Sequence, residues 1–153
     1  MARSGASLPA GRNHAPLTDP EQLRVSNTCL GLERGVPFRV ESRERTRFRV
    51  WEENGEEHAE IVFGADVYPG TGVVDPNSSL SMVAAVAHEL AHYFRWRDKT
   101  EISDNRLEHI DESLTSLEAI LRYYGHFSEN ERQQLIRDAI QRLQLFIQSN
   151  ADE

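Results

Sequence analysis

The residues best suited to chemistry stand in the run His88-Glu89-Leu90-Ala91-His92. Four residues of an α-helix correspond to about 400° of rotation, so the two histidines lie on one face, one turn apart. Two imidazoles placed in this way can bind one zinc ion through nitrogen. Glu89 lies about 100° around the helix from His88. There it could reach a metal-bound water as a general base without itself being a ligand.

The residues around this motif predict a buried helix from about residue 79 to residue 97. Asparagine and serine at 77–79 offer N-cap oxygens. The flanks at 84–87 and 93–94 are uncharged, so most sides of the helix should be buried. Burying three unsatisfied polar side chains is costly, and a bound metal removes that cost. The alternative is a helix with two hydrogen-bonded core histidines.

A catalytic zinc takes three protein ligands, so the third ligand should come from another element. The next predicted helix, at about 105–124, has apolar positions three and four residues apart, which form one stripe: Leu107, Ile110, Leu114, Leu117, Leu121 and Tyr124. A second stripe of acids and small residues lies on another side, at Glu108, Glu112, Thr115 and Ala119. Small neighbours allow close approach of another helix.

Glu112 is therefore the preferred third ligand, and Glu108 is the next choice. Asp111 or Glu108 could instead hold an N–H group of a ligating histidine. The remaining candidates for the third ligand are Glu101, His109, Asp111, Glu118 and His126.

The rest of the chain predicts an α+β fold. Alternating residues at 36–64 indicate an antiparallel meander of about three strands, with an Asn-Gly hairpin turn at 54–55. Three helices should follow the strands, the last of them starting at a Ser128-to-Glu131 capping box. Residues 1–20 are expected to form a flexible N-terminal tail, and residues 21–150 a single domain.

Composition limits the function classes. The 153 residues, 17.5 kDa in mass, carry a formal net charge of −8, which argues against nucleic acid as the main partner. No apolar run approaches the length of a membrane span, and no signal-peptide pattern is visible. The one cysteine, Cys29, cannot form an internal disulfide. We therefore expect a cytoplasmic protein.

The motif and its spacing resemble the gluzincin branch of zinc metallopeptidases. In that branch a glutamate on the next helix follows H-E-x-x-H after about nineteen residues, and nineteen residues separate His92 from Glu112 here. The segment 110–115 resembles the aminopeptidase L-N-E-G-F-A segment. The order of strands before helices further resembles the minimal ImmA/IrrE-type metallopeptidase domain. The likeness covers about residues 58–124.

This resemblance implies a zinc-dependent metallopeptidase that acts on a protein or peptide. His88, His92 and Glu112 would be the zinc ligands, and Glu89 the catalytic acid/base. A substrate would pair with the strand before the metal helix, at about 59–63. The oxyanion-stabilising group stays open among Tyr123, Tyr124, His109, His126 and Arg106.

Two other interpretations stay open. A domain with this zincin-like fold could bind metal without turnover, as a regulatory or interaction module of a larger assembly. A helical scaffold without metal is the third possibility.

Overall fold

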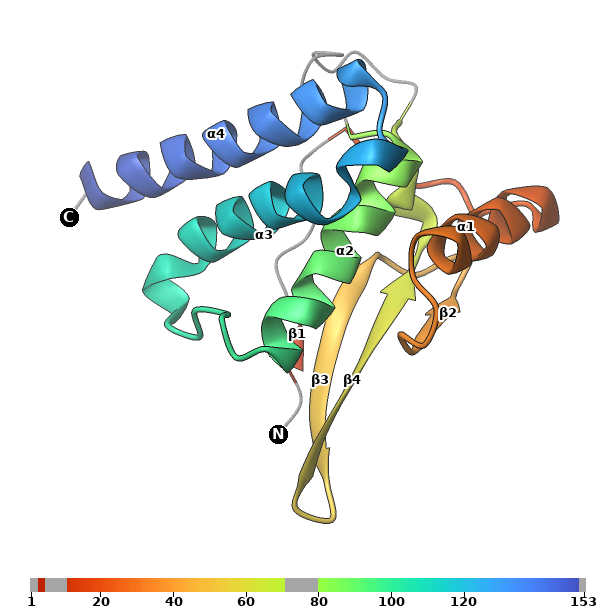
Figure 1. The fold of residues 1–153 in the computed structure, drawn as a ribbon, viewed down its shortest axis with the longest axis horizontal. Helices are drawn as coiled ribbons and strands as arrows, with labels where there is room; N and C mark the ends of the chain where they lie inside the picture. The colour runs from red at the N-terminus through yellow and green to blue at the C-terminus, as the bar shows by residue number, and fades with distance from the viewer. Residues whose placement is uncertain (1–2, 5–10, 71–79, 152–153) are drawn as a thin grey trace.

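The computed structural model describes residues 3–4, 11–70 and 80–151, and these form an α+β fold (Figure 1). Within these ranges the fold comprises a mixed sheet, four α-helices and three short 3-10 turns. The strands are β1 (Arg3–Ser4), β2 (Phe38–Val40), β3 (Arg47–Glu53) and β4 (Glu56–Phe63). The helices are α1 (Asp19–Leu32), α2 (Met82–Arg97), α3 (Glu108–Tyr123) and α4 (Glu129–Ala151).

The predicted hairpin is present between β3 and β4. Asn54 and Gly55 both have positive φ, at 53° and 80°, which is the backbone conformation that the tight turn requires. Phe48 and Val50 are buried while their neighbours in β3 are more exposed. One face of this hairpin therefore faces the core, as the alternation of residues indicates.

The expected meander is wrong, because β2 does not pair with β3. The sheet order is β1-β3-β4-β2, and β2 runs parallel to β4, with Phe38 opposite Ile61. β4 therefore lies inside the sheet with a partner on each side. The alternation in these segments identifies strands and their faces, but it carries no information about which strands are neighbours.

The expectation of three helices is also wrong, because α1 precedes the strands. Thr18 caps it in a capping box with Glu21, and Pro20 stands in its first turn. Both are helix-start signals. α1 buries only Val25 and Cys29, so its apolar periodicity is too weak to predict a helix of this length.

Part of the expected N-terminal tail packs against the domain. The guanidinium of Arg12 donates hydrogen bonds to the carbonyls of Asp66, Val67 and Leu80. Leu17 is also buried. Residues 1–2 and 5–10 of this stretch lie outside the described residues.

α2 is the central element and contacts α1, α3, α4, β3 and β4 (Figure 1). It begins at Met82, later than expected, because the side chain of Ser81 accepts the capping hydrogen bond from Ala84 N. The N-cap residues expected at 77–79 lie outside the described part of the chain. α2 is buried almost all round, as its uncharged flanks indicate.

α3 and α4 follow as a helical pair on the side of α2 away from the hairpin tip (Figure 1). α4 begins at the predicted capping box, since Ser128 Oγ accepts from Glu131 N and Glu131 Oε1 accepts from Ser128 N. None of the helices in the described ranges has the length and apolar character needed to cross a membrane.

Candidate metal centre

The motif lies in the middle of α2, where the surroundings are closed. His88, Glu89 and His92 are 1%, 2% and 6% exposed. The ring of Phe48, from β3, lies almost parallel to that of His92, with centroids 6.0 Å apart. The sheet therefore closes one side of the motif, and α3 closes another.

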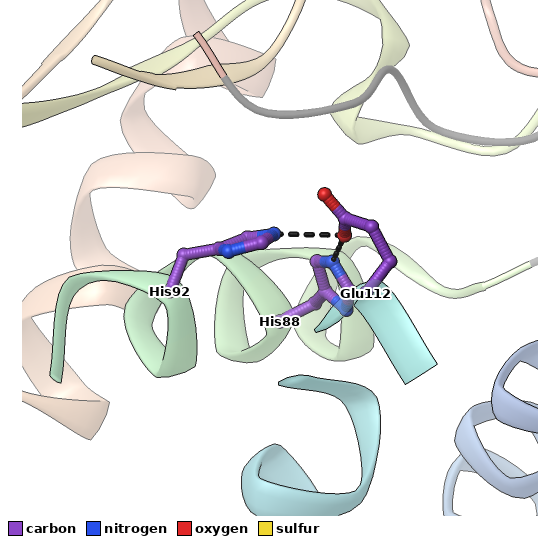
Figure 2. A group of neighbouring side chains, drawn as sticks. All are labelled: His88, His92 and Glu112. Carbon is purple, nitrogen blue, oxygen red and sulfur yellow. Dashed lines mark hydrogen bonds and ion pairs between the residues drawn. The ribbon is translucent and has the colours of Figure 1, made fainter. Parts of the chain in front are cut away.

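α3 brings Glu112 to the two histidines (Figure 2). Glu112 Oε2 lies 2.8 Å from His88 Nε2 and 2.8 Å from His92 Nε2. One ligand atom from each of the three residues lies within 4.8 Å of the others. The three residues predicted as metal ligands thus meet at one buried point.

A hydrogen-bond chain fixes the proton on His88. Ser116 Oγ donates to the carboxylate of Asp138, and Ser116 Oγ lies 2.8 Å from His88 Nδ1. With its own proton given to Asp138, this hydroxyl accepts from Nδ1–H. In that tautomer the neutral ring carries no proton on Nε2, so Nε2 is free to act as a metal ligand. The buried group His88, His92 and Glu112 could hold a metal ion.

Without a metal, a proton on His92 can be shared with Glu112. Burial by itself would lower the pKa of His92, but the charge and hydrogen bond of Glu112 raise it to about 9. Burial would likewise raise the pKa of Glu112, yet the two histidines hold it well below its ordinary value. These shifts favour a proton on His92 beside an ionised Glu112 when no metal is bound, and a dication that binds the same atoms would displace that proton.

The sequence pattern did not reveal Asp138 and Arg142, a buried pair on α4 that lies behind His88. Asp138 is fully buried and accepts from Arg142 Nε at 2.8 Å. Arg142 Nη1 lies 3.7 Å from Glu112 Oε2. One signal was available: an Asp and an Arg four residues apart, next to the buried positions Leu135 and Ala139.

The hydrogen bonds of the Asp138–Arg142 pair leave two buried polar atoms without a partner among the described residues. Asp138 Oδ1 and Arg142 Nη2 are buried and have no hydrogen-bond partner among the described residues. Burial alone would lower the pKa of Arg142, but Asp138 and Glu112 raise it. A fixed positive charge thus stands behind Glu112.

The surroundings of Glu89 indicate a role different from that of Glu112. It is buried, and no hydrogen bond to another described residue holds it. Burial raises its pKa, which the histidines oppose and Glu112 reinforces. A carboxylate with a raised pKa beside a metal site suits proton transfer near neutral pH.

The alternative ligands are placed elsewhere. Glu108 is exposed at the start of α3. Asp111 pairs with Arg95 at 2.8 Å and accepts from Ile102 N, so it does not hold a histidine N–H. Ser116, not Asp111, is the residue that accepts a hydrogen bond from a histidine N–H, at Nδ1 of His88. Of the other third-ligand candidates, none has a ligand atom in the group around His88.

Three of the five expected oxyanion candidates are exposed or bonded elsewhere. The Tyr123 hydroxyl donates to Glu33, on the α1 side of the molecule. Arg106 is 87% exposed and pairs with Asp104. Tyr124 is exposed as well. Arg142, on α4, also places a guanidinium near the Glu112 carboxylate, at the distance given above.

A cavity of about 500 Å³ lies at the C-terminal end of α2. Its lining comprises Glu57, Trp96, Arg97, Lys99, Glu101 and Ser103.

No family model, no curated protein and no solved structure matches this chain. The geometry of the site is therefore what any functional assignment rests on.

Proposed function

We propose that the chain is a zinc-dependent metallopeptidase, with His88, His92 and Glu112 as ligands and Glu89 as general base. The main support for the proposal is that two separate helices direct ligand atoms at the same point. An H-E-x-x-H helix and an acid from the next helix direct three ligand atoms at one point.

The donor set favours zinc among the divalent metals. Two imidazole nitrogens and one carboxylate oxygen are a common set for catalytic zinc, which keeps a further position open for water. When bound, zinc polarises a carbonyl group and lowers the pKa of a water molecule that it holds.

The remaining chemistry belongs to residues of the chain. Glu89 would accept a proton at its carboxylate and pass it on to the leaving amine. Ser116 and Asp138 keep the His88 proton on Nδ1, which leaves Nε2 available as a ligand. The ring of Phe48 packs parallel to the His92 ring and would help to keep water away from it. The setting that we propose is a reducing one such as the cytoplasm, because Cys29 is a free thiol.

The strand expected to pair with a substrate is mostly paired already. β3 runs along one side of β4, and β2 covers the other side at residues 61–63, so only residues 59 and 60 of the expected segment lack a described strand partner on that side. Substrate recognition in this proposal would therefore rely mainly on side chains or on another strand.

The alternative function, a metal-binding module without turnover, is favoured by one observation. His88, Glu89 and Glu112 are each no more than 2% exposed, so a peptide has no direct access in this conformation. Such a module would use the metal to fix α2 against α3 and would act as a regulatory or interaction subunit.

The first experiment is elemental analysis of the purified protein and three alanine variants. We expect about one zinc per chain in the wild type, and loss of zinc in His88→Ala and Glu112→Ala. Glu118→Ala, a substitution on the same helix as Glu112, is the matched control and should retain zinc. A wild type that takes up no metal even after reconstitution would contradict both metal-based functions and leave the helical scaffold.

Glu89→Gln then separates the peptidase from the silent module. The amide is close in size to the carboxylate and is not a ligand, so zinc content should stay unchanged. Hydrolysis of an unstructured protein such as casein should fall to background in this variant. Absence of hydrolysis in the zinc-loaded wild type would favour the silent module instead.

A further inference from the structure

The outer edge of β3, the edge that faces away from β4, is mostly unpaired. In the sheet order β1-β3-β4-β2, β4 takes one side of β3 and β1 takes part of the other. β1 has two residues, whereas β3 has seven. Most of this edge therefore has no strand partner among the described residues, and its main-chain N–H and C=O groups can accept another strand.

β3 contacts the candidate metal centre through Phe48. The ring of Phe48 lies almost parallel to the ring of His92, with the centroids 6.0 Å apart. Phe48 and Val50 are buried on the side of the sheet against which α2 packs. A strand added to the outer edge would lie about 4.8 Å from β3, so it would run past the His92 side of the metal centre.

β1 already uses this edge as an added antiparallel strand (Figure 1). Arg3 stands opposite Val50, and Ser4 stands opposite Arg49. A peptide in the same register that is longer by one residue would place that residue opposite Phe48. Directly opposed residues of an antiparallel pair have their side chains on the same face, with Cβ atoms about 4.5–5.5 Å apart. The added side chain would thus point to the core side of the sheet, beside Phe48.

The other strands of the described sheet offer less to a peptide. β4 has β3 along one side and β2 along part of the other. β2 is the second edge strand, but it has only three residues and contacts α1. The outer edge of β3 is therefore the long free edge that lies beside the metal centre. Pairing with such an edge holds a peptide extended through main-chain hydrogen bonds and demands little of its sequence.

A second contact keeps β1 close to this edge. Arg12 follows Ser4 by eight positions and is buried. Its guanidinium donates to the carbonyls of Asp66, Val67 and Leu80, which fixes this point of the chain to the domain. A tether this short gives β1 an effective concentration on the order of millimolar at the edge. Two paired residues supply few hydrogen bonds, so a longer strand can replace them.

We propose that the outer edge of β3 binds the substrate as an extended antiparallel strand, and that the chain's own Arg3–Ser4 strand occupies this edge as an intramolecular competitor. The proposal rests on the proposed function, because only a peptidase has a peptide substrate. A peptide has to displace β1 before it can pair with β3 next to His92. The competitor therefore raises the substrate concentration that the enzyme needs, and its effect disappears when substrate is saturating.

Peptide binding tests the edge without turnover. The probe is a fluorescein-labelled peptide with the sequence of residues 1–10, MARSGASLPA, and fluorescence anisotropy reports its binding. The full chain carries Glu89→Gln, so that the probe is not cleaved. Adding Arg3→Pro and Ser4→Pro removes the two N–H groups of β1, and we expect this chain to bind the probe at least tenfold more tightly. A probe with the same two prolines should bind neither chain.

Arg3→Ala with Ser4→Ala, again with Glu89→Gln, is the matched control. Alanine keeps both main-chain N–H groups, so this chain should bind the probe no better than the chain with Glu89→Gln alone. Hydrogen exchange read by mass spectrometry gives a second measurement. Amides of residues 47–53 should exchange faster in the proline chain and slow down again with excess probe. Unchanged protection of α2 would show that the proline chain is folded.

Three binding results would overturn the proposal. The first is equal affinity of the proline and alanine chains for the probe. The second is a proline chain that binds no probe. The third is a proline chain that dimerises in analytical ultracentrifugation, because a second copy would then take the edge instead of a substrate.

Hydrolysis of casein separates this proposal from the proposed function. With Glu89 restored and zinc bound, the proline chain should have a KM for casein at least tenfold lower than that of the wild type, with an unchanged kcat. An unchanged KM would overturn the competitor role of β1. If no chain hydrolyses casein while the difference in probe binding holds, the peptide-docking edge is supported and the peptidase function fails.

Discussion

Ser116 joins His88 to Asp138, two residues on different helices. Its hydroxyl lies 2.8 Å from Nδ1 of the histidine and donates to the carboxylate of the aspartate. α2, α3 and α4 thus each contribute one member of a single chain of hydrogen bonds. The candidate metal centre depends on the packing of three helices, and not on the motif alone.

Ser116→Ala tests that chain of hydrogen bonds. The substitution frees Nδ1 and allows the His88 ring to change tautomer and orientation, while Asp138 keeps its bond to Arg142. We expect zinc affinity to fall about 10- to 100-fold, measured by competition with a chromogenic chelator. Ser149→Ala, on an exposed turn of α4, should leave the affinity unchanged. Equal affinities in the two variants would show that Ser116 does not position the ligand.

Arg142→Met tests the buried pair behind Glu112. The variant leaves the Asp138 carboxylate buried without its cation, and loss of one partner of such a pair typically costs about 3–5 kcal/mol. Urea unfolding of the metal-free protein should report this loss in the free energy of unfolding. The double variant Asp138→Leu with Arg142→Met removes both charges and should recover most of the stability.

Arg106→Met is the control for this measurement, because Arg106 forms an exposed pair with Asp104. Its unfolding midpoint should match that of the wild type. If the double variant is no more stable than Arg142→Met, the pair does not act as a unit.

Cys29 should react very slowly in the folded protein. Burial, and to a lesser degree Glu33, raises the pKa of this thiol to about 12. The thiolate is the reactive form and lies far below half of the population at neutral pH. Labelling with a disulfide reagent should therefore speed up about tenfold per pH unit from pH 7 to pH 9 without a plateau. The denatured chain should level off near the ordinary thiol pKa of about 8.5. A plateau in the native protein below pH 9 would contradict this.

Gly64→Ala should be destabilising although its backbone is not strained. A Cβ atom at this position would overlap the backbone carbonyl of Glu44, which is held by its hydrogen bond from Ala65 N. Overpacking of this kind costs about 1–3 kcal/mol. Gly31→Ala, where a Cβ meets open space within α1, should instead raise stability by about 0.5–1 kcal/mol. Thermal unfolding of both variants beside the wild type measures the difference.

One face of α3 was predicted from the sequence and the other was not. The spacing of Glu112, Thr115 and Ala119 predicted a face that another helix could approach closely, and this face is buried against α2. The helical repeat could be read because it is local. The direction in which the leucines point could not, because it depends on which neighbour α3 packs against.

The parts that could not be predicted are the long-range ones. β2 beside β4 and Asp138 behind His88 are both set by tertiary packing between segments distant in the chain. α1 has clear capping residues in Thr18 and Glu21, but it lacks the apolar periodicity that would have given its length.

The placement of β2 has a consequence for the order of folding events. β2 pairs only with β4 within the described sheet, and the whole of β3 lies between these two strands in the chain. The β3–β4 hairpin closes through a turn of two residues and can form within microseconds. The pairing of β2 with β4 has to close a longer loop, because all of β3 lies within it. We therefore expect the hairpin to form first and β2, the first of these three strands in the chain, to dock onto it last.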